Sequence, residues 1–217
     1  MKNKILYKAE KFDNIRDLIN NSVKLYPSNI ASYTNFQNDI NYVGTGLQKL
    51  GYKDKRIAVI GKNCYEWAVT YYAVINGLGV IVPLDKGLPK EEIESLLIRS
   101  KADMIVFEKS YEDSINEIFQ KKSTNLKEVV CMEKSKFNDI KCLDDIKQIG
   151  EKELKNGNNN YLDNEIDNKK MASIIFTSGT TSLAKAVMLS HYNIVSNIYS
   201  MQCVEKMYST DVNMAFL

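Results

Sequence analysis

The chain has 217 residues, of which 44% are hydrophobic and 26% are charged, and its formal net charge is +2. These values are ordinary for a globular protein, and they predict one domain, or one domain with a piece of another, that buries a substantial core. The small net charge disfavours a nucleic-acid partner, whose binding surface normally needs a concentrated basic excess.

The cysteines and the apolar stretches bear on cellular location. The 4 cysteines are widely spaced and form no Cys-x-x-Cys pair, so neither a zinc site nor a disulfide framework is indicated. Residues 1–11 carry charges throughout and lack the apolar core of a signal peptide. The longest apolar stretch, around 67–75, is about half as long as a membrane span. The sequence predicts a cytoplasmic protein without a transmembrane segment.

The first part of the chain predicts two helices with a short strand between them. Apolar side chains recur at helical spacing over 14–25 and again from 39 to 50, and a strand is expected over 31–36. Gly44 and Gly46 lie inside the second helix. They lack the preceding strand and the third glycine of a dinucleotide-binding fingerprint, so that function has little support.

Short apolar strands then alternate with amphipathic helices. Strands are predicted over 56–60, 80–84, 104–107 and 128–132, and helices over 64–78, 90–100 and 111–121. Asn63 is the expected N-cap of the helix that follows it. Strands separated by helices of this length pair in parallel through right-handed crossovers. The sequence therefore predicts an α/β fold: a doubly wound, largely parallel sheet with helices on both faces.

Residues 134–170 are charged and rich in asparagine. A modest helix near 143–154 is expected, followed by an exposed, mobile connector. Asp163, Glu165 and Asp167 offer carboxylates for a metal ion, but a solvated loop is the favoured interpretation.

The most informative stretch runs from residue 172 to residue 191. An apolar run over 172–176 predicts a strand, and small or hydroxylated residues follow over 177–182. Lys185, a second short apolar run and a helix over 192–207 come next. This order suits a phosphate-binding loop beyond the carboxyl end of a strand, where ligands bind in doubly wound sheets. An ordinary Ser/Thr/Gly turn between two strands is the alternative.

The residue types of this loop suit a polyphosphate. Gly179 lets backbone amides converge on oxygen atoms, and Lys185 supplies a full positive charge. Hydroxyl groups that can add donors or reach a magnesium ion belong to Thr177, Ser178, Thr180 and Thr181. The loop is not of the Walker A type, because Ala186 follows the lysine and the glycine spacing differs.

His191 is the only histidine of the sequence. A catalytic role has little support, because no serine lies in a Gly-x-Ser-x-Gly nucleophile elbow. A structural capping or hydrogen-bonding role is favoured.

The string from Thr177 to Thr181, with Lys185 at its offset and residues 187–191 behind it, resembles the signature of the adenylate-forming enzymes. That superfamily holds acyl-CoA synthetases, firefly-type luciferases and peptide-synthetase adenylation domains. Weaker likeness covers nearly the whole chain, and it is greatest to bacterial long-chain acyl-CoA synthetases. The residues that carry this weaker likeness are 32–47, Lys62, Asn63, Trp67 and 82–85.

Three positions of the loop depart from that signature. Ser182 and Ala186 stand where the family usually has glycine, and Ala184 stands where it has proline. Ser182 and Ala184 alter the stiffness of the loop, and Ala186 would be strained if its position required positive φ. The hydroxyl cluster and Lys185 are intact.

The resemblance implies a two-step ligase that uses ATP, Mg²⁺ and coenzyme A. A carboxylate, most in keeping with the likeness a fatty acid, becomes an acyl-adenylate, and a thiol then displaces AMP. Lys185 would neutralise charge as the catalytic residue of this chain, and Thr180 and Thr181 would reach Mg²⁺ through the phosphates. The phosphate contacts implied for this chain are Thr177, Ser178, Gly179, Thr180, Thr181 and Lys185.

The resemblance also implies the extent of the domain. Residues 1–217 would form a truncated N-terminal α/β domain with a core over 1–133, a polar connector region over 134–170 and the phosphate-loop region over 171–217. This portion alone is not expected to complete adenylation, because the family's adenine contacts and small carboxy-terminal domain come later. A non-catalytic ATP- or AMP-binding module and a structural domain that has lost its ligand are the alternatives.

Overall fold

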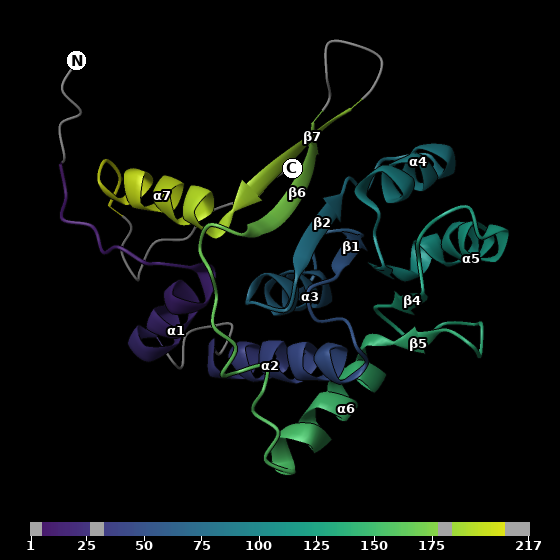
Figure 1. Ribbon diagram of the computed structural model, residues 1–217, viewed down its shortest axis with the longest axis horizontal. Coiled ribbons are helices and arrows are strands. Elements are labelled where there is room, and N and C mark those ends of the chain that lie inside the picture. Colours follow the sequence, from purple (N-terminus) through teal and green to yellow (C-terminus); the bar gives the residue numbers. More distant parts are fainter. Residues whose placement is uncertain (1–5, 27–32, 178–183, 207–217) are drawn as a thin grey trace.

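The computed structural model describes residues 6–26, 33–177 and 184–206 (Figure 1). The α-helices are α1 (Ile15–Leu25), α2 (Tyr33–Lys49), α3 (Tyr65–Ile75), α4 (Lys90–Ser100), α5 (Glu112–Lys121), α6 (Leu143–Lys155) and α7 (His191–Gln202). The strands are β1 (Arg56–Ile60), β2 (Val80–Leu84), β3 (Met104–Phe107), β4 (Glu128–Cys131), β5 (Lys141–Cys142), β6 (Met171–Thr177) and β7 (Lys185–Ser190). A short 3₁₀ helix, η1 (Lys109–Tyr111), precedes α5.

The strands form one sheet in the order β5-β4-β3-β1-β2-β6-β7. Every neighbouring pair is parallel except β6 and β7, which are antiparallel. The central strand β1 pairs with β2 through Ile57 and Ile81, and with β3 through Ile57 and Met104. The doubly wound, largely parallel sheet predicted from the alternating pattern is confirmed.

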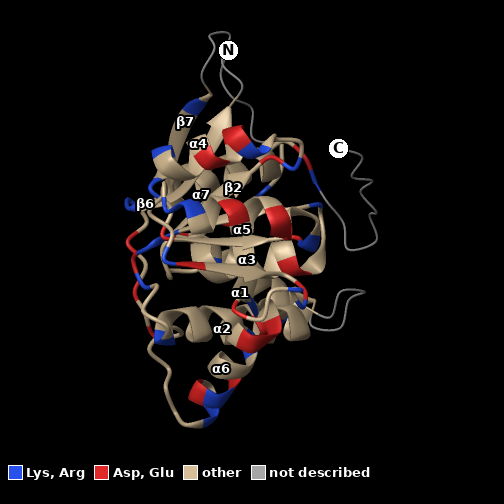
Figure 2. Ribbon diagram, turned by 90° about the vertical axis from the view of Figure 1, so that its right-hand side faces the viewer, with Lys and Arg blue, Asp and Glu red and all other residues tan. Residues whose placement is uncertain are grey.

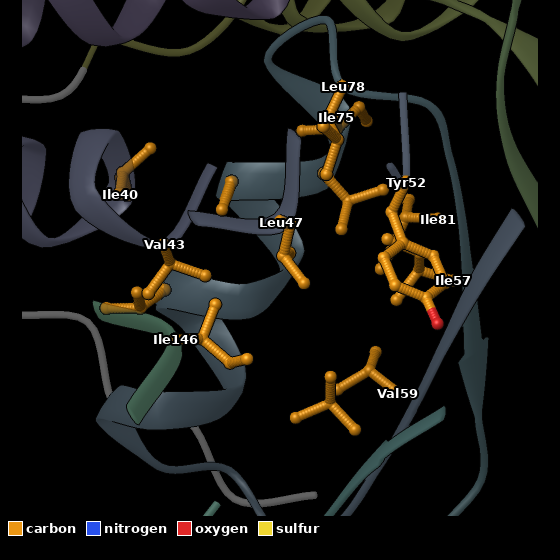
Figure 3. Close-up of a cluster of buried hydrophobic side chains, with 14 of the residues drawn as sticks. Ile40, Val43, Leu47, Tyr52, Ile57, Val59, Ile75, Leu78, Ile81 and Ile146 are labelled. Atoms are coloured by element: carbon orange, nitrogen blue, oxygen red, sulfur yellow. The ribbon is translucent and has the colours of Figure 1, made fainter. Parts of the chain in front are cut away.

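Helices cover both faces of this sheet. Ile57 and Val59 of β1 point into one core cluster, beside residues of α2 and α3 (Figure 3). Ala58 and Ile60 point into the other, which α4 and α5 close. Successive side chains of a strand face opposite sides, so a strand with helices on both sides must be apolar throughout. All four of these side chains are 0% exposed.

On the first face, α3, α2 and α6 follow one another away from the sheet (Figures 1 and 2). The close contact between α2 and α6 depends on glycines. A Cβ at Gly46 would overlap the Ile146 carbonyl, and one at Gly150 would overlap the Tyr42 carbonyl. A Cβ at Gly44 would overlap the ring of Tyr161. Gly44 and Gly46 therefore serve helix packing, and they form no dinucleotide-binding loop.

The strand predicted over 31–36 is wrong where the structure describes it, because α2 already begins at Tyr33. Residues 31 and 32 lie outside the described residues. Phe36 lies on the helix face that also carries Ile40, and its ring meets the rings of Tyr65 and Tyr72 edge-on, with 5.7 Å between centroids in each pair. These tertiary contacts of an aromatic side chain outweigh its intrinsic preference for strands.

Other bounds need smaller corrections. Asn63 is not the N-cap of α3, because the extended residue before the first helical turn is Cys64. That helix ends at Ile75 instead of Leu78, and the two-residue strand β5 was not predicted, since so short a strand leaves no periodic pattern. The strands β1, β2 and β3 and the helix α4 have the predicted bounds.

The asparagine-rich stretch after α6 is anchored instead of being exposed throughout. Tyr161 is 1% exposed, and its hydroxyl donates to the Ala73 carbonyl at 2.8 Å. Arg16 of α1 donates to the carbonyls of Tyr161 at 2.9 Å and Asn164 at 2.8 Å. Most residues over 156–170 are exposed, as expected, but one tyrosine and one arginine anchor this polar stretch to the rest of the chain.

Asp163, Glu165 and Asp167 are exposed, and the part of the chain that the structure describes contains no group of three or more His, Cys, Asp or Glu side chains able to hold a metal ion. All four cysteines are free. Across residues 6–26, 33–177 and 184–206, no helix has the length and apolar character to cross a membrane.

Candidate phosphate-binding hairpin

The predicted phosphate loop lies between the two strands of an antiparallel hairpin, β6 and β7. β6 pairs in parallel with β2 through Ser173 and Ile81, and its later residues pair with β7. In Figure 1 the two strands extend together past the end of β2. The loop therefore follows the carboxyl end of β6, on the side of a doubly wound sheet where ligands bind.

The burial of β6 changes along its length. Ala172, Ser173 and Ile174 are buried, whereas Ile175 is 36% exposed and Thr177 is exposed. Along β7, residues 185–188 are exposed. The hairpin is thus fixed in the sheet at its base and open to solvent near the loop.

Two of the predicted site residues meet across this hairpin. Thr177 is the last residue of β6, Lys185 is the first residue of β7, and the two are a cross-strand pair. Directly opposed residues of antiparallel strands project from the same face, with Cβ atoms roughly 4.5–5.5 Å apart. The structure therefore brings a hydroxyl group and a positive charge together at the two ends of the loop. Predicted site residues outside the described residues are Ser178, Gly179, Thr180 and Thr181.

The charge of Lys185 is available for a ligand. The side chain is exposed, and no acidic side chain of the described residues pairs with it.

Ala186 carries no backbone strain. It lies within β7 opposite Phe176. Among the described residues, positive φ at a residue other than glycine occurs only at Asp54, Lys101 and Lys122. The strain considered for alanine at this position is therefore absent, and a strand accepts its methyl group.

Comparison with known proteins decides the family. Residues 10–217 match the family described as AMP-binding enzyme. This chain belongs to the AMP-binding enzyme family.

Curated relatives are about a quarter identical to this chain over the aligned residues. Crotonobetaine/carnitine–CoA ligase of Salmonella paratyphi B is 26% identical over 164 residues, which are 75% of this chain and 31% of that protein. Bacitracin synthase 2 of Bacillus licheniformis is 24% identical over 199 residues, or 90% of this chain and 7% of that protein. The chain thus spans about a third or less of these relatives.

Solved structures show that the fold is shared. A long-chain-fatty-acid–CoA ligase from Archaeoglobus fulgidus superposes with a TM-score of 0.71 at 18% identity, covering 91% of this chain and 40% of that one. The seven-stranded sheet with its helices is therefore the N-terminal part of the acyl-CoA synthetase-like fold.

One residue beside the hairpin of this AMP-binding family member escaped the sequence analysis. Arg99, in the last turn of α4, donates from Nη2 to the Ala184 carbonyl at 2.5 Å. Its guanidinium carbon also lies 5.3 Å from the centroid of the Phe176 ring. No local pattern could have found this contact, because 85 residues separate Arg99 from Ala184.

His191 lies at the opposite end of β7 from the phosphate loop. It is the first residue of α7, but the N-cap is Ser190, whose Oγ accepts from the Asn193 amide at 3.2 Å, so the capping role suggested for His191 is wrong. Its side chain is 4% exposed, and Nδ1 has no hydrogen-bond partner among the described residues. Burial, with a smaller contribution from the nearby charge of Arg16, lowers the pKa of His191 to about 4. The imidazole is neutral and buried, and the length of β7 separates it from the loop.

Proposed function

We propose that this chain is the N-terminal part of an ATP-dependent acyl-CoA synthetase, which activates a carboxylate as an acyl-adenylate and transfers the acyl group to coenzyme A. The observation that carries the proposal is the cross-strand pair of Thr177 and Lys185 at the carboxyl end of β6. Membership of the AMP-binding enzyme family supports it.

The proposed reaction overcomes the poor reactivity of a carboxylate. A carboxylate oxygen forms a bond to the α-phosphorus of ATP, and the bond from that phosphorus to the bridging oxygen breaks, so that pyrophosphate leaves. The thiol sulfur of coenzyme A then bonds to the acyl carbon, its proton goes to solvent or a base, and AMP leaves with the electron pair of the broken carbon–oxygen bond. Both steps release phosphate groups whose negative charge must be stabilised.

The hairpin of this chain would stabilise the charge of the first leaving group. We assign Thr177, with 178–181, to contacts with the β- and γ-phosphates, and Lys185 to neutralising their charge. Both described members sit at the ends of the loop on one face of the hairpin, so one ligand could contact both. Thr180 and Thr181 are proposed to reach a magnesium ion carried by the phosphates; Mg²⁺ would supply further charge neutralisation.

The proposal extends to substrate class and location. A fatty acid is favoured as the carboxylate by the resemblance of the sequence to bacterial long-chain acyl-CoA synthetases, and a long-chain-fatty-acid–CoA ligase is among the proteins that share the fold. A cytoplasmic location is favoured by four free thiols in a chain without a disulfide.

The test compares Lys185→Ala with Lys169→Ala. Both changes remove one exposed lysine charge, but Lys169 precedes β6 at the end far from the loop. In the whole protein that contains this chain, Lys185→Ala should slow ATP–pyrophosphate exchange by about 10- to 100-fold, as expected for loss of a hydrogen bond to a charged group. Lys169→Ala should change the rate less than twofold.

Three other outcomes have defined meanings. Unchanged exchange in a folded Lys185→Ala protein would refute the assignment of the loop. Binding of Mg-ATP without pyrophosphate exchange in the whole protein would favour a non-catalytic nucleotide-binding module. Absence of any Mg-ATP binding would favour a structural domain. The 217-residue chain alone is expected to show no exchange, and turnover by it would contradict that expectation.

A further inference from the structure

The last turn of α4 meets the hairpin next to the phosphate loop. Arg99 reaches both strands' ends: its Nη2 donates to the Ala184 carbonyl at 2.5 Å, and its guanidinium carbon stands 5.3 Å from the centre of the Phe176 ring. Phe176 directly precedes Thr177, and Ala184 directly precedes Lys185. One side chain thus contacts the residues that precede the two described members of the site.

The shape of arginine suits this double contact. A planar guanidinium can lie over an aromatic face while its N–H groups donate in the plane, whereas a lysine ammonium is a point charge without that plane. The ring of Phe176 and the methyl group of Ala184 also pack against the core cluster closed by α4 and α5. Arg99 therefore covers the place where the hairpin enters that core.

The hairpin needs such a restraint. In β6, Ile175 and Thr177 are exposed and Phe176 is only partly buried, and β7 is exposed over 185–188. Ala184 is itself the residue at which the loop rejoins the strand, and alanine does not fix φ as a proline would. A hydrogen bond to its carbonyl from a separate helix limits the same freedom from outside.

We propose that Arg99 is a positioning residue of the phosphate loop: by holding the Ala184 carbonyl and the Phe176 ring, it fixes the direction in which Lys185 and Thr177 face the bound phosphates. This inference rests on the proposed function of the loop. Arg99 acts through Ala184 and Phe176, and it is not assigned any contact with substrate.

The experiment uses Arg99→Ala and Arg99→Lys, with Lys90→Ala as the matched control. Lys90 begins the same helix and pairs with Glu117 at 2.6 Å, so its loss removes the same charge from α4 without touching the hairpin. Hydrogen exchange of the amides of β6 and β7 reports the restraint directly. The affinity for Mg-ATP, measured by calorimetry, reports its consequence.

Arg99→Ala should speed amide exchange around residues 176–177 and 184–186 by about 3- to 10-fold, as expected for a charge-assisted hydrogen bond partly screened by solvent. The dissociation constant for Mg-ATP should rise by a similar factor. Arg99→Lys should recover less than half of the loss on a logarithmic scale, because charge alone does not restore the planar contact. Lys90→Ala should leave exchange and affinity within a factor of two.

The two proposals fail in different ways. Unchanged hairpin exchange in Arg99→Ala, or an equal effect of Lys90→Ala, would overturn the positioning role. Full recovery by Arg99→Lys would overturn it too, because a long-range charge would then suffice. If the unmodified protein binds no Mg-ATP, the proposed function of the loop fails and the positioning of phosphates fails with it, while faster exchange in Arg99→Ala would still show that Arg99 restrains the hairpin.

Discussion

The centre of the sheet and the β6–β7 hairpin are built in opposite ways. At the centre, parallel strands lie between two layers of helices, and every residue of β3 is buried. At the edge of the same sheet, β6 and β7 are antiparallel, and β7 is exposed over most of its length. Stability is therefore concentrated in the centre, whereas the candidate site lies where burial contributes little.

This division is useful for a site that binds phosphate. Substitutions in buried parallel strands disturb packing. The exposed end of a hairpin, in contrast, can carry hydroxyl groups and a lysine at small cost in stability. The difference predicts that substitutions in the two regions will affect different measurements: unfolding for the centre, ligand binding for the hairpin.

The largest effect is expected from the same substitution made in each region. Ile57→Ala, in β1 at 0% exposure, should lower the free energy of unfolding by about 2–5 kcal/mol. Ile175→Ala, in the hairpin at 36% exposure, should lower it by less than about 1 kcal/mol. Urea denaturation followed by circular dichroism measures both. Equal losses would show that the hairpin is as much a part of the core as β1.

A second prediction concerns acid, at the point where β7 joins the body. His191 has a pKa of about 4 in the folded chain against an ordinary value of 6.5, so the unfolded chain binds the extra proton between these values. The stability that comes from keeping this side chain neutral is complete above pH 6.5 and is lost as the pH falls towards 4. The loss by pH 4.5 should be about 2–3 kcal/mol.

His191→Gln is the control for this prediction, because glutamine does not titrate. Other charged groups line the same pocket, among them Asp54, Glu165 and Asp167 with Lys53 and Lys170. Their contribution remains in the variant and cancels when the two urea titrations are subtracted. A wild-type curve parallel to that of His191→Gln between pH 7.5 and pH 4.5 would contradict the buried, neutral histidine.

A third prediction concerns the contact between α2 and α6, which lies far from the hairpin (Figure 1). Gly150→Ala puts a methyl group against the Tyr42 carbonyl, so α2 and α6 must move apart, at an expected cost of about 1–3 kcal/mol. Gly87→Ala is the matched control, because the nearest atom to its added Cβ would be 3.9 Å away. Thermal unfolding separates the two variants. Weakened Mg-ATP binding in a folded Gly150→Ala protein would contradict the independence of the two regions.

The sequence predicted the parts of the fold whose signal is local. Runs such as 56–60 and 104–107 are apolar almost throughout, and a short apolar run of this kind between two helices is typical of a buried parallel strand. The strand predicted over 31–36 was wrong because Phe36 lies on a helix. Its ring packs against Tyr65 and Tyr72, which belong to another helix.

In the candidate site, too, the residues with a local sequence signal were predicted and the residue with only a long-range contact was not. Thr177 and Lys185 were found from a compact string of residues, and the structure places them opposite each other. Arg99 was not found, because its hydrogen bond to Ala184 spans 85 positions of the sequence and one arginine at the end of a helix has many possible uses. The roles assigned to Thr177, 178–181 and Lys185 stay predictions.

The contacts of Arg16 also determine how late in protein synthesis the N-terminal helix can be fixed in place. Its bond to the Asn164 carbonyl joins residues 148 positions apart. At a synthesis rate of roughly 5–20 residues per second, about 7–30 s pass between the two ends of this contact leaving the ribosome's catalytic centre. During that interval α2 is already available to pack against α1, but the Tyr161 and Asn164 carbonyls that Arg16 binds are not. The N-terminal helix can therefore reach its final place only after residue 164 has been synthesised, so the first and last thirds of the described chain are joined late in synthesis.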